Sequence, residues 1–408
     1  MKKKILNKLL QHQSLGIIVF GAGSFFLTNI ILKEKLSDRE YGEYSMVMTF
    51  FSMLYIYGLL GLEQVFVKYS HVKEKNSIET NRFLLRMSIF SLFISSVISC
   101  SFFLIYYDKI PINPLLFIVT TVAMSSMLLM YSIFRLNSNF VLAQIAQNGF
   151  KILFFVCILI MLIIKRFNLN EILLGLAFCI LLVFLAEIVI LKDKFRFVLE
   201  LKTTQKTIIT AGFYFFISTA TFSLINFADR YLIENKFGIE KVGDYFYLSN
   251  IFLAPFSILQ SYIGFRKLVD YKNLYTVDKF KKNNKINLVL GIILSLLLLL
   301  VFQILVSINI VNFDFYAEKN IILLLLVLGT VKLYSAGIYP AFDLMISLEN
   351  LKKAKLIVMF LSLMILIITF LWAKNIETII SFIILIWLLK TLILRSFLLL
   401  QEKNKHFE

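Results

Sequence analysis

Long apolar segments alternate with short polar segments along the whole chain. Twelve runs of about twenty residues consist mainly of Leu, Ile, Phe and Val, and the stretches between them hold most of the charged residues. A helix of about twenty apolar residues spans the hydrocarbon core of a bilayer, whereas a barrel strand needs only about ten in alternation. The predicted crossings are 15–32, 44–67, 87–107, 115–134, 141–164, 172–191, 208–227, 245–265, 288–308, 321–341, 356–373 and 376–394.

The composition fits a membrane protein of this kind. Of 408 residues, 59% are hydrophobic and 16% are charged, and the mean hydropathy is +0.84. Water-soluble domains are about half apolar and about a quarter charged. We therefore predict an all-α membrane protein with twelve transmembrane helices, and the composition excludes a water-soluble globule and a disordered chain.

The positive charges predict the orientation of the helices. An even number of crossings places both termini on one side of the membrane. That side holds 28 of the 42 Lys and Arg residues, against 11 on the other side and three within crossings. Because cytoplasmic segments are enriched in Lys and Arg, we expect cytoplasmic N and C termini. The net charge of +17 is then an orientation signal, and no nucleic acid is expected as a partner.

Several functional classes lack their sequence signatures. The cysteines lie inside apolar runs and the histidines lie at the termini or in a loop, so no metal site is predicted. No G-x-x-x-x-G-K-[ST] sequence occurs, which argues against an ATP-driven pump. The longest predicted loop, from 266 to 287, is Lys-rich and cytoplasmic, and the outside loops are short. We therefore expect a protein that is not an enzyme.

The two halves of the chain share a short motif. Gly42-Glu43-Tyr44 opens the second crossing, and Gly243-Asp244-Tyr245 opens the eighth crossing 201 residues later. The offset is about half the chain and leaves equal numbers of crossings on each side, as in transporters built from repeats. We predict an N-terminal six-helix lobe over residues 1–200 and a C-terminal six-helix lobe over residues 201–408.

Polar residues inside the crossings are the candidate functional residues, because ionisable groups at membrane depth cost about 2.5–3.5 kcal/mol each on insertion scales. In the fifth crossing four of them stand at i, i+3, i+4 and i+7, on one helical face. They are Gln144, Gln147, Asn148 and Lys151. We predict that this face lines a cavity; the alternative is hydrogen bonding between helices.

The tenth crossing carries a second polar face. Lys332, Tyr339 and Asp343 are related by spacings of seven and four, and Gly337 and Pro340 lie between them. The glycine and the proline are expected to weaken the helix at that point. A bent, half-polar helix suits a moving gate, and an internal ion pair of Lys332 with another crossing is the alternative.

Two further crossings carry weaker stripes. In the seventh crossing the aligned residues are Thr219, Ser223, Asn226 and Arg230, near its outer end. Asp229 lies just off this stripe. In the second crossing they are Ser45, Thr49, Ser52 and Glu63. For Arg230 and Glu63, extension of the side chain to the membrane interface is the alternative. Anchoring of a helix end is the predicted role of Arg135, Glu187, Arg266 and Lys390.

The stripes together hold more cations than carboxylates. Lys and Arg form charge-assisted hydrogen bonds to phosphate, and amides and hydroxyls suit sugar hydroxyls. The residues by themselves therefore predict a transporter of a polar or anionic solute.

Short motifs resemble those of the polysaccharide-precursor flippases, the O-antigen and capsule (Wzx-type) branch of the multidrug/oligosaccharidyl-lipid/polysaccharide exporter superfamily. The first is Leu36–Ser45, between the first two crossings, and Gly61-Leu62 and Lys68-Tyr69 close the second crossing. Asp229-Arg230 and Val242–Tyr245 are similar to that family's Asp-Arg and Val-Gly-x-Tyr phrases. Three departures argue against the peptidoglycan lipid as substrate. Lys68 stands where family members tend to have Arg, the first crossing contains no Arg, and the chain has twelve crossings rather than fourteen.

The resemblance implies two six-helix lobes of a MATE-like exporter fold around a central cationic cavity that opens alternately to the two sides. It implies transport of an undecaprenyl-diphosphate-linked oligosaccharide, the O-antigen or capsule repeat unit, across the bacterial plasma (inner) membrane. The implied partners are this lipid-linked oligosaccharide, membrane lipids and the glycan polymerase machinery. No cofactor is expected apart from a coupling proton or cation.

Within this hypothesis the candidate residues take separate roles. Lys151, Lys332 and Arg230 meet the diphosphate, and the amides of the fifth crossing bind the sugars. Asn226 and Tyr339 complete the predicted substrate-binding set. The coupling ion is assigned to Glu63, Asp229 or Asp343, with a structural ion pair as the alternative for each.

Two other functions are alternatives. A cation-coupled multidrug or metabolite exporter of the same superfamily is expected to have a more acidic and aromatic cavity. A membrane glycan polymerase or ligase would need catalytic residues on a sizeable outside loop. Neighbouring genes for glycosyltransferases and sugar-nucleotide enzymes would favour the flippase.

Overall fold

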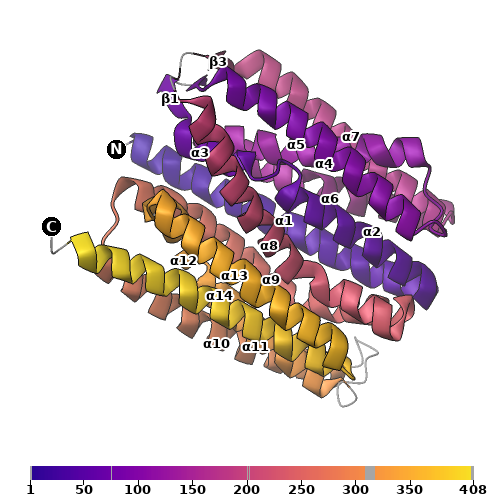
Figure 1. Cartoon of the computed structure of the whole chain (residues 1–408). Coiled ribbons are helices and arrows are strands. Elements are labelled where there is room, and N and C mark those ends of the chain that lie inside the picture. The colour runs from indigo at the N-terminus through magenta and orange to yellow at the C-terminus, as the bar shows by residue number, and fades with distance from the viewer. Residues whose placement is uncertain (1, 75, 200, 202, 308–317, 406–408) are drawn as a thin grey trace. The chain divides into compact units, whose positions relative to one another are not determined.

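The computed structural model describes residues 2–74, 76–199, 201, 203–307 and 318–405 (Figure 1). Within this part of the chain, twelve helical segments are long and apolar enough to cross a membrane, which confirms the twelve predicted crossings. Most helices extend a few residues beyond the predicted ends, because hydropathy marks only the part inside the bilayer. Residue 308, the predicted end of the ninth crossing, lies outside the described residues.

The elements follow each other in a simple order. The first half contains α1 (Lys2–Lys35), α2 (Asp38–Tyr57), α3 (Leu62–Tyr69), β1 (His71–Glu74), β2 (Ser77–Glu79), α4 (Arg82–Tyr106), α5 (Pro114–Leu136), α6 (Phe140–Ile164), α7 (Leu169–Lys194) and β3 (Arg196–Val198). The second half contains α8 (Gln205–Phe237), α9 (Ile239–Asn273), α10 (Val277–Ser307), α11 (Lys319–Ser335), α12 (Ile338–Met345), α13 (Leu348–Trp372) and α14 (Ile376–Lys405).

Two crossings are broken into separate helices. In the tenth, α11 ends at Ser335 and α12 begins at Ile338, which confirms the predicted weak point beside Gly337 and Pro340. In the second, α2 and α3 are separated by four residues, of which Leu60 and Gly61 have φ of 50° and 77°. The left-handed backbone at these residues stops the helix. The sequence analysis did not predict this second break.

Gly61 is required by its conformation and by its surroundings. A Cβ at this position would collide with the backbone of Phe215 and Phe216 on α8. We therefore expect Gly61→Ala to destabilise the protein by about 1–3 kcal/mol, since strain and collision add. The midpoint of thermal unfolding of the purified protein would fall accordingly.

Two other glycines provide matched controls for this prediction. Gly238 has φ of 87° but open space around its Cβ position, and Gly16 of α1 has open space and no positive φ. Gly238→Ala is expected to cost less than Gly61→Ala, and Gly16→Ala nothing measurable. An equal effect of all three substitutions would contradict this account of the break.

Contacts between residues divide the chain into two units. Unit 1 comprises Met1–Phe227 and Ile239–Asp244, and unit 2 comprises Ala228–Gly238 and Tyr245–Glu408. The predicted pair of lobes, with its boundary after residue 200, stays a prediction. The two units are described separately.

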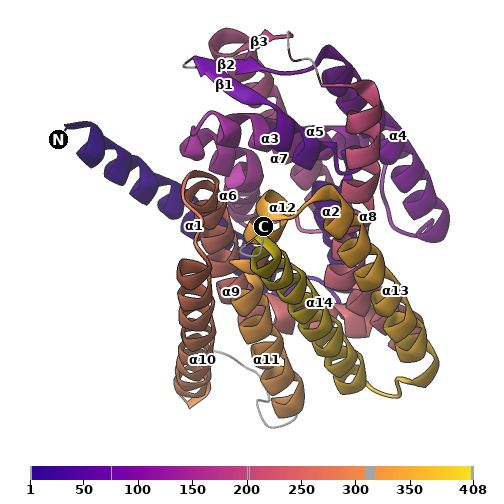
Figure 2. The same cartoon turned by 60° about the vertical axis from the view of Figure 1, so that its left-hand side comes forward.

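A three-stranded sheet, not predicted from the sequence, lies at one end of unit 1 (Figure 2). β2 pairs antiparallel with β1 and parallel with β3. Beside it, Asn81 Nδ2 donates to the carbonyl oxygens of Leu201 and Thr203, each at 2.9 Å. The segment between α7 and α8 is therefore tied to the hairpin that follows α3.

The two copies of the repeated motif are in contact within unit 1. A Cβ on Gly42 would collide with the backbone oxygen of Ile239, and one on Gly243 would come within 3.2 Å of the backbone nitrogen of Gly42. Beside this contact Lys33 Nζ lies 2.7 Å from Asp38 Oδ1 and 2.8 Å from Asp244 Oδ1. The motif glycines thus permit a close crossing of α2 and α9, and the ion pairs stabilise it.

In unit 2, α10, α11, α14 and α13 lie side by side in this order (Figure 2). The predicted loop from 266 to 287 is wrong: α9 continues to Asn273 and α10 begins at Val277, so only residues 274–276 connect them. The helices extend past the apolar runs because Lys and Asn do not stop a helix once its apolar continuation is packed.

Candidate functional site

A chain of polar side chains runs along α6 in unit 1. Lys151 Nζ donates a hydrogen bond to Asn148 Oδ1 at 3.0 Å, and Asn148 Nδ2 donates to Gln144 Oε1 at 3.0 Å. Gln144 and Asn148 are buried, and Gln147 is half-buried. The predicted common face of Gln144, Asn148 and Lys151 is confirmed by these hydrogen bonds.

Helix α1 covers this polar face. A Cβ on Gly21 would come within 2.6 Å of Asn148 Cβ, so the two helices pass very close at this point. One turn further, the ring centroid of Phe25 lies 5.9 Å from Lys151 Nζ, and that of Phe150 lies 5.8 Å away. The Lys151 ammonium is therefore held by an amide oxygen and two aromatic rings.

A second cationic group lies in unit 2, and we call it the tryptophan–lysine cluster. Its members are Lys332 of α11, Tyr339 of α12, and Trp387 and Lys390 of α14. The Trp387 ring centroid lies 5.1 Å from Lys332 Nζ and 5.0 Å from Lys390 Nζ. Tyr339 packs edge-on against Trp387 with centroids 6.1 Å apart, and Lys390 Nζ lies 4.6 Å from the Tyr339 ring.

Asp343 lies within electrostatic range of Tyr339 and Lys390, but its ion-pair partner is outside this cluster. Lys332, Tyr339 and Asp343 were expected on one continuous face, but the break at residues 336–337 separates α11 from α12. Asp343 instead forms an ion pair with Lys355 of α13, with 3.1 Å between Oδ1 and Nζ. The break therefore interrupts the predicted face between Lys332 and Tyr339, although both contact Trp387, whereas Tyr339 and Asp343 keep their i, i+4 relation on α12.

Asp229 and Arg230 lie on the part of α8 that belongs to unit 2. Asp229 is buried and accepts hydrogen bonds from Tyr245 Oη at 2.5 Å and from the Arg230 backbone N–H at 2.9 Å. The Arg230 guanidinium carbon lies 4.7 Å from the ring centroid of Phe246. Lys332 is within electrostatic range of both residues.

Among the remaining predicted residues, Glu63 is not aligned as expected. Glu63 is buried on α3, beyond the break in the second crossing, so it does not continue the stripe of Ser45, Thr49 and Ser52. Those three hydroxyls donate to carbonyl oxygens of their own helix. Asn226 Nδ2 likewise donates to the Phe222 carbonyl oxygen at 3.0 Å.

The sequence analysis assigned too little to α14. Lys390 was expected to anchor a helix end, but its side chain is 6% exposed, and Glu187 on α7 is also buried. Trp387 was not singled out. The only available signal was local: Trp387 and Lys390 stand at i and i+3 near the middle of their crossing, so they share a face.

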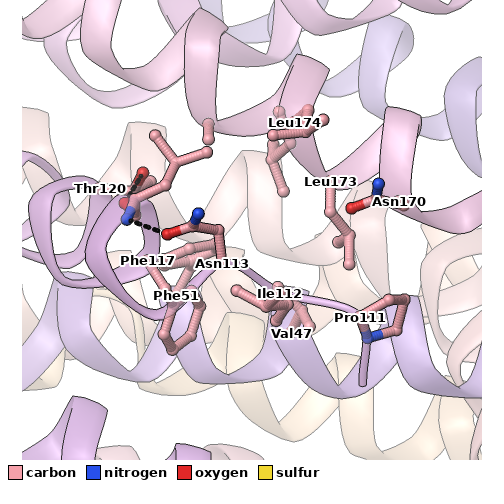
Figure 3. Close-up of a pocket in the computed structure, with 13 residues that line it drawn as sticks. Val47, Phe51, Pro111, Ile112, Asn113, Phe117, Thr120, Asn170, Leu173 and Leu174 are labelled. Carbon is pink, nitrogen blue, oxygen red and sulfur yellow. Dashed lines mark hydrogen bonds between the residues drawn. The ribbon is translucent and has the colours of Figure 1, made fainter. Parts of the chain in front are cut away.

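A separate apolar pocket lies in unit 1 and contains none of the predicted site residues (Figure 3). Its cavity volume is about 20 Å³; it lies between α2, α5, α7 and the segment before α5, and its lining includes Phe51, Phe117 and Leu173. The Asn113 side chain at its edge accepts hydrogen bonds from the backbone N–H groups of Leu115 and Leu116. The polar group of Asn113 is therefore bound within the chain, and the lining of the pocket is mainly apolar.

Comparison with known proteins gives a family and a fold. Residues 13–265 match the family described as "Polysaccharide biosynthesis protein". No curated protein sequence matches the chain. The likeness of the following solved structures, all at low identity, shows a MATE-like fold.

The MATE multidrug transporter DinF-BH has a TM-score of 0.62 at 12% identity, over 96% of this chain and 95% of that chain. An outward-facing multidrug resistance MATE family transporter of the MOP superfamily has a TM-score of 0.58 at 11% identity, over 98% and 96%. A MOP superfamily transporter from Pyrococcus furiosus, described as having a binding pocket of reverse polarity, has a TM-score of 0.51 at 10% identity, over 97% and 96%.

Proposed function

The chain belongs to the family of polysaccharide biosynthesis proteins and has a MATE-like transporter fold, and from this premise we propose that it is a flippase for lipid-linked repeat units of a surface polysaccharide. The substrate is an undecaprenyl-diphosphate-linked oligosaccharide destined for O-antigen or capsule. It moves from the cytoplasmic to the outer leaflet of the bacterial inner membrane, and both protein termini are cytoplasmic.

The observation that carries the proposal is the pair of cationic groups inside the crossings, one in each unit. Lys151 lies beside buried amides on α6, and Lys332 lies against Trp387. Buried ammonium groups are expensive in a membrane and usually mark a substrate or ion pathway. Ammonium and amide groups together match the two parts of a glycosyl diphosphate, its phosphates and its sugar hydroxyls.

Each candidate residue has a role in this proposal. Lys151, Lys332 and Arg230 bind the diphosphate, and Tyr339 and Asn226 contribute hydrogen bonds. Gln144, Gln147 and Asn148 bind the sugars. The polyprenyl tail stays in the bilayer, because moving it into a polar site would lose its favourable burial in hydrocarbon.

Alternating access is the proposed mechanism, with breaks in the second and tenth crossings as the points where helices bend. Glu63, Asp229 and Asp343 are the candidates for binding a coupling proton or cation. Asp229 is hydrogen-bonded to Tyr245, and Asp343 is ion-paired with Lys355. For these two acids, coupling would require exchange of the present partner for the ion.

The cationic groups also favour a flippase over a cation-coupled drug exporter. A drug exporter for cations needs acidic residues facing its substrate. In this chain the aromatic rings of Phe25 and Trp387 lie next to the ammonium groups of Lys151 and Lys332. If the protein were a drug exporter, its deletion would change drug susceptibility without changing the surface polysaccharide.

Deletion of the gene tests the proposed function directly. We expect lipid-linked repeat units to accumulate on the cytoplasmic leaflet and the surface polysaccharide to disappear, because synthesis continues while transfer to the outer leaflet stops. Leaflet location can be measured by accessibility of the oligosaccharide to a glycosidase in oriented membrane vesicles. The complemented strain is the control, and a deletion strain with normal polysaccharide and no accumulation would refute the proposal.

A further inference from the structure

Two lysines of unit 2 share a single aromatic ring. Lys332 of α11 and Lys390 of α14 place their ammonium groups about 5 Å from the Trp387 centroid, so these groups lie within about 10 Å of each other. The side chain of Trp387 is fully buried, and those of Lys332 and Lys390 are 9% and 6% exposed. The three residues form a buried group with two cationic side chains inside the unit.

The acids within electrostatic range of Lys332 and Lys390 are Asp229 and Asp343, and each also binds another group. Asp343 forms its ion pair with Lys355, and Asp229 accepts the hydroxyl of Tyr245. Lys355 itself adds a further positive charge within electrostatic range of Lys390. Like charges at short range in a low-dielectric interior repel each other, and an anion bound between them would relieve that repulsion.

We propose that Lys332, Lys390 and Trp387 form a diphosphate-binding site within unit 2. This inference rests on the proposed function and adds Lys390 and Trp387 to it as binding residues. Each ammonium group takes one phosphoryl group, and the indole fixes the distance between the two lysines. Residues 387–390 lie near the middle of the crossing Ile376–Gln401, the depth at which transporter substrate sites occur.

The chain offers a built-in reporter for this site. It contains two tryptophans, Trp372 and Trp387, and Trp372 is 74% exposed at the end of α13. The variant Trp372→Phe therefore carries one fluorophore, inside the proposed site. We expect titration of this variant, reconstituted in lipid nanodiscs, with inorganic pyrophosphate to give a saturable change in Trp387 emission.

Variants of the lysines then locate the binding. In the Trp372→Phe background, Lys390→Gln and Lys332→Gln are each expected to weaken pyrophosphate binding at least about tenfold, as loss of one charge-assisted hydrogen bond predicts. Lys353→Gln is the matched control, because it removes an exposed lysine of the same unit that is paired with Glu349. It should bind like the parent.

Each outcome decides the proposal. No saturable response in the parent, or equal binding by Lys390→Gln, would overturn it. If Lys390→Gln does not fold, Lys390→Arg, which keeps the charge, must bind pyrophosphate within a few-fold of the Trp372→Phe parent. A loss as large as that of Lys332→Gln would count against the site.

A second ligand identifies the source of the diphosphate. Tighter binding of farnesyl diphosphate than of pyrophosphate assigns the site to a lipid-linked ligand, and equal binding assigns it to the diphosphate alone. If the Trp372→Phe variant supports polysaccharide display but pyrophosphate does not change its Trp387 emission, only this site is refuted. If the emission changes but the variant does not support display, only the flippase function is refuted.

Discussion

Reversing the charge of Lys151 is expected to abolish surface polysaccharide while the protein still accumulates in the membrane. In the native protein the Lys151 ammonium is held by Asn148 and by the rings of Phe25 and Phe150. In Lys151→Glu a carboxylate would face the negative faces of both rings and the diphosphate of the substrate, so each favourable contact becomes repulsive. The Asn148 amide can rotate and donate to the new carboxylate, so the fold is expected to survive.

Surface polysaccharide stained with a specific antibody or lectin measures this effect, normalised to the amount of protein in the membrane fraction. We expect a loss of at least about tenfold, since a single charge-assisted hydrogen bond contributes about 1.5–3 kcal/mol. Lys165→Glu, at the exposed end of the same helix, is the matched control and should display normally. Lys151→Arg should retain most display because it keeps the charge.

The membrane architecture could be predicted from sequence because the signals are local and strong. Each crossing is a separate apolar run, and the distribution of Lys and Arg tests the number of runs. The break beside Gly337 was predictable for the same reason, since Gly and Pro act on the backbone where they stand. The break at Leu60 and Gly61 was not, because it depends on the close approach of α8.

Elements that depend on distant contacts were missed. The strands β2 and β3 are three residues each and are separated by more than a hundred residues, so neither is recognisable before the pairing is known. The helical segment around residues 266–287 was missed for a different reason. Its Lys and Asn residues resemble a loop by polarity, although their helix propensity is adequate.

The candidate site divides in the same way. Gln144, Asn148 and Lys151 lie on one helix at helical spacing, so their hydrogen-bonded chain could be predicted. The tryptophan–lysine cluster joins α11, α12 and α14, and no spacing along the sequence relates Lys332 to Trp387 or Lys390. Lys332 and Tyr339 show the converse error, since a helical spacing of seven was applied across the break between α11 and α12.

Charge reversal at Lys332 is expected to have an effect as large as that at Lys151, but for a different physical reason. In Lys332→Glu a carboxylate would replace the ammonium group that lies 5.1 Å from the Trp387 ring centroid, and the Lys390 ammonium lies 5.0 Å from the same centroid. A pair of opposite charges there is stable in a low-dielectric interior if its geometry is good. The variant should therefore fold, with a negative group near Lys390 where the native protein has the Lys332 ammonium that meets the anion.

Loss of polysaccharide display in Lys332→Glu, at normal protein levels, is the expected result, and Lys374→Glu in the exposed α13–α14 connection is the control. The double variant Lys332→Glu/Lys390→Glu removes the internal pair and both cations, so display should not recover and thermal stability should fall below that of the single variant. Recovery of display in the double variant would mean that the cluster serves packing rather than binding.

The two charge reversals together test the proposed role of the lysines. Unimpaired display in both Lys151→Glu and Lys332→Glu would exclude these lysines as the groups that meet the diphosphate, because no anion site can tolerate reversal of its cations.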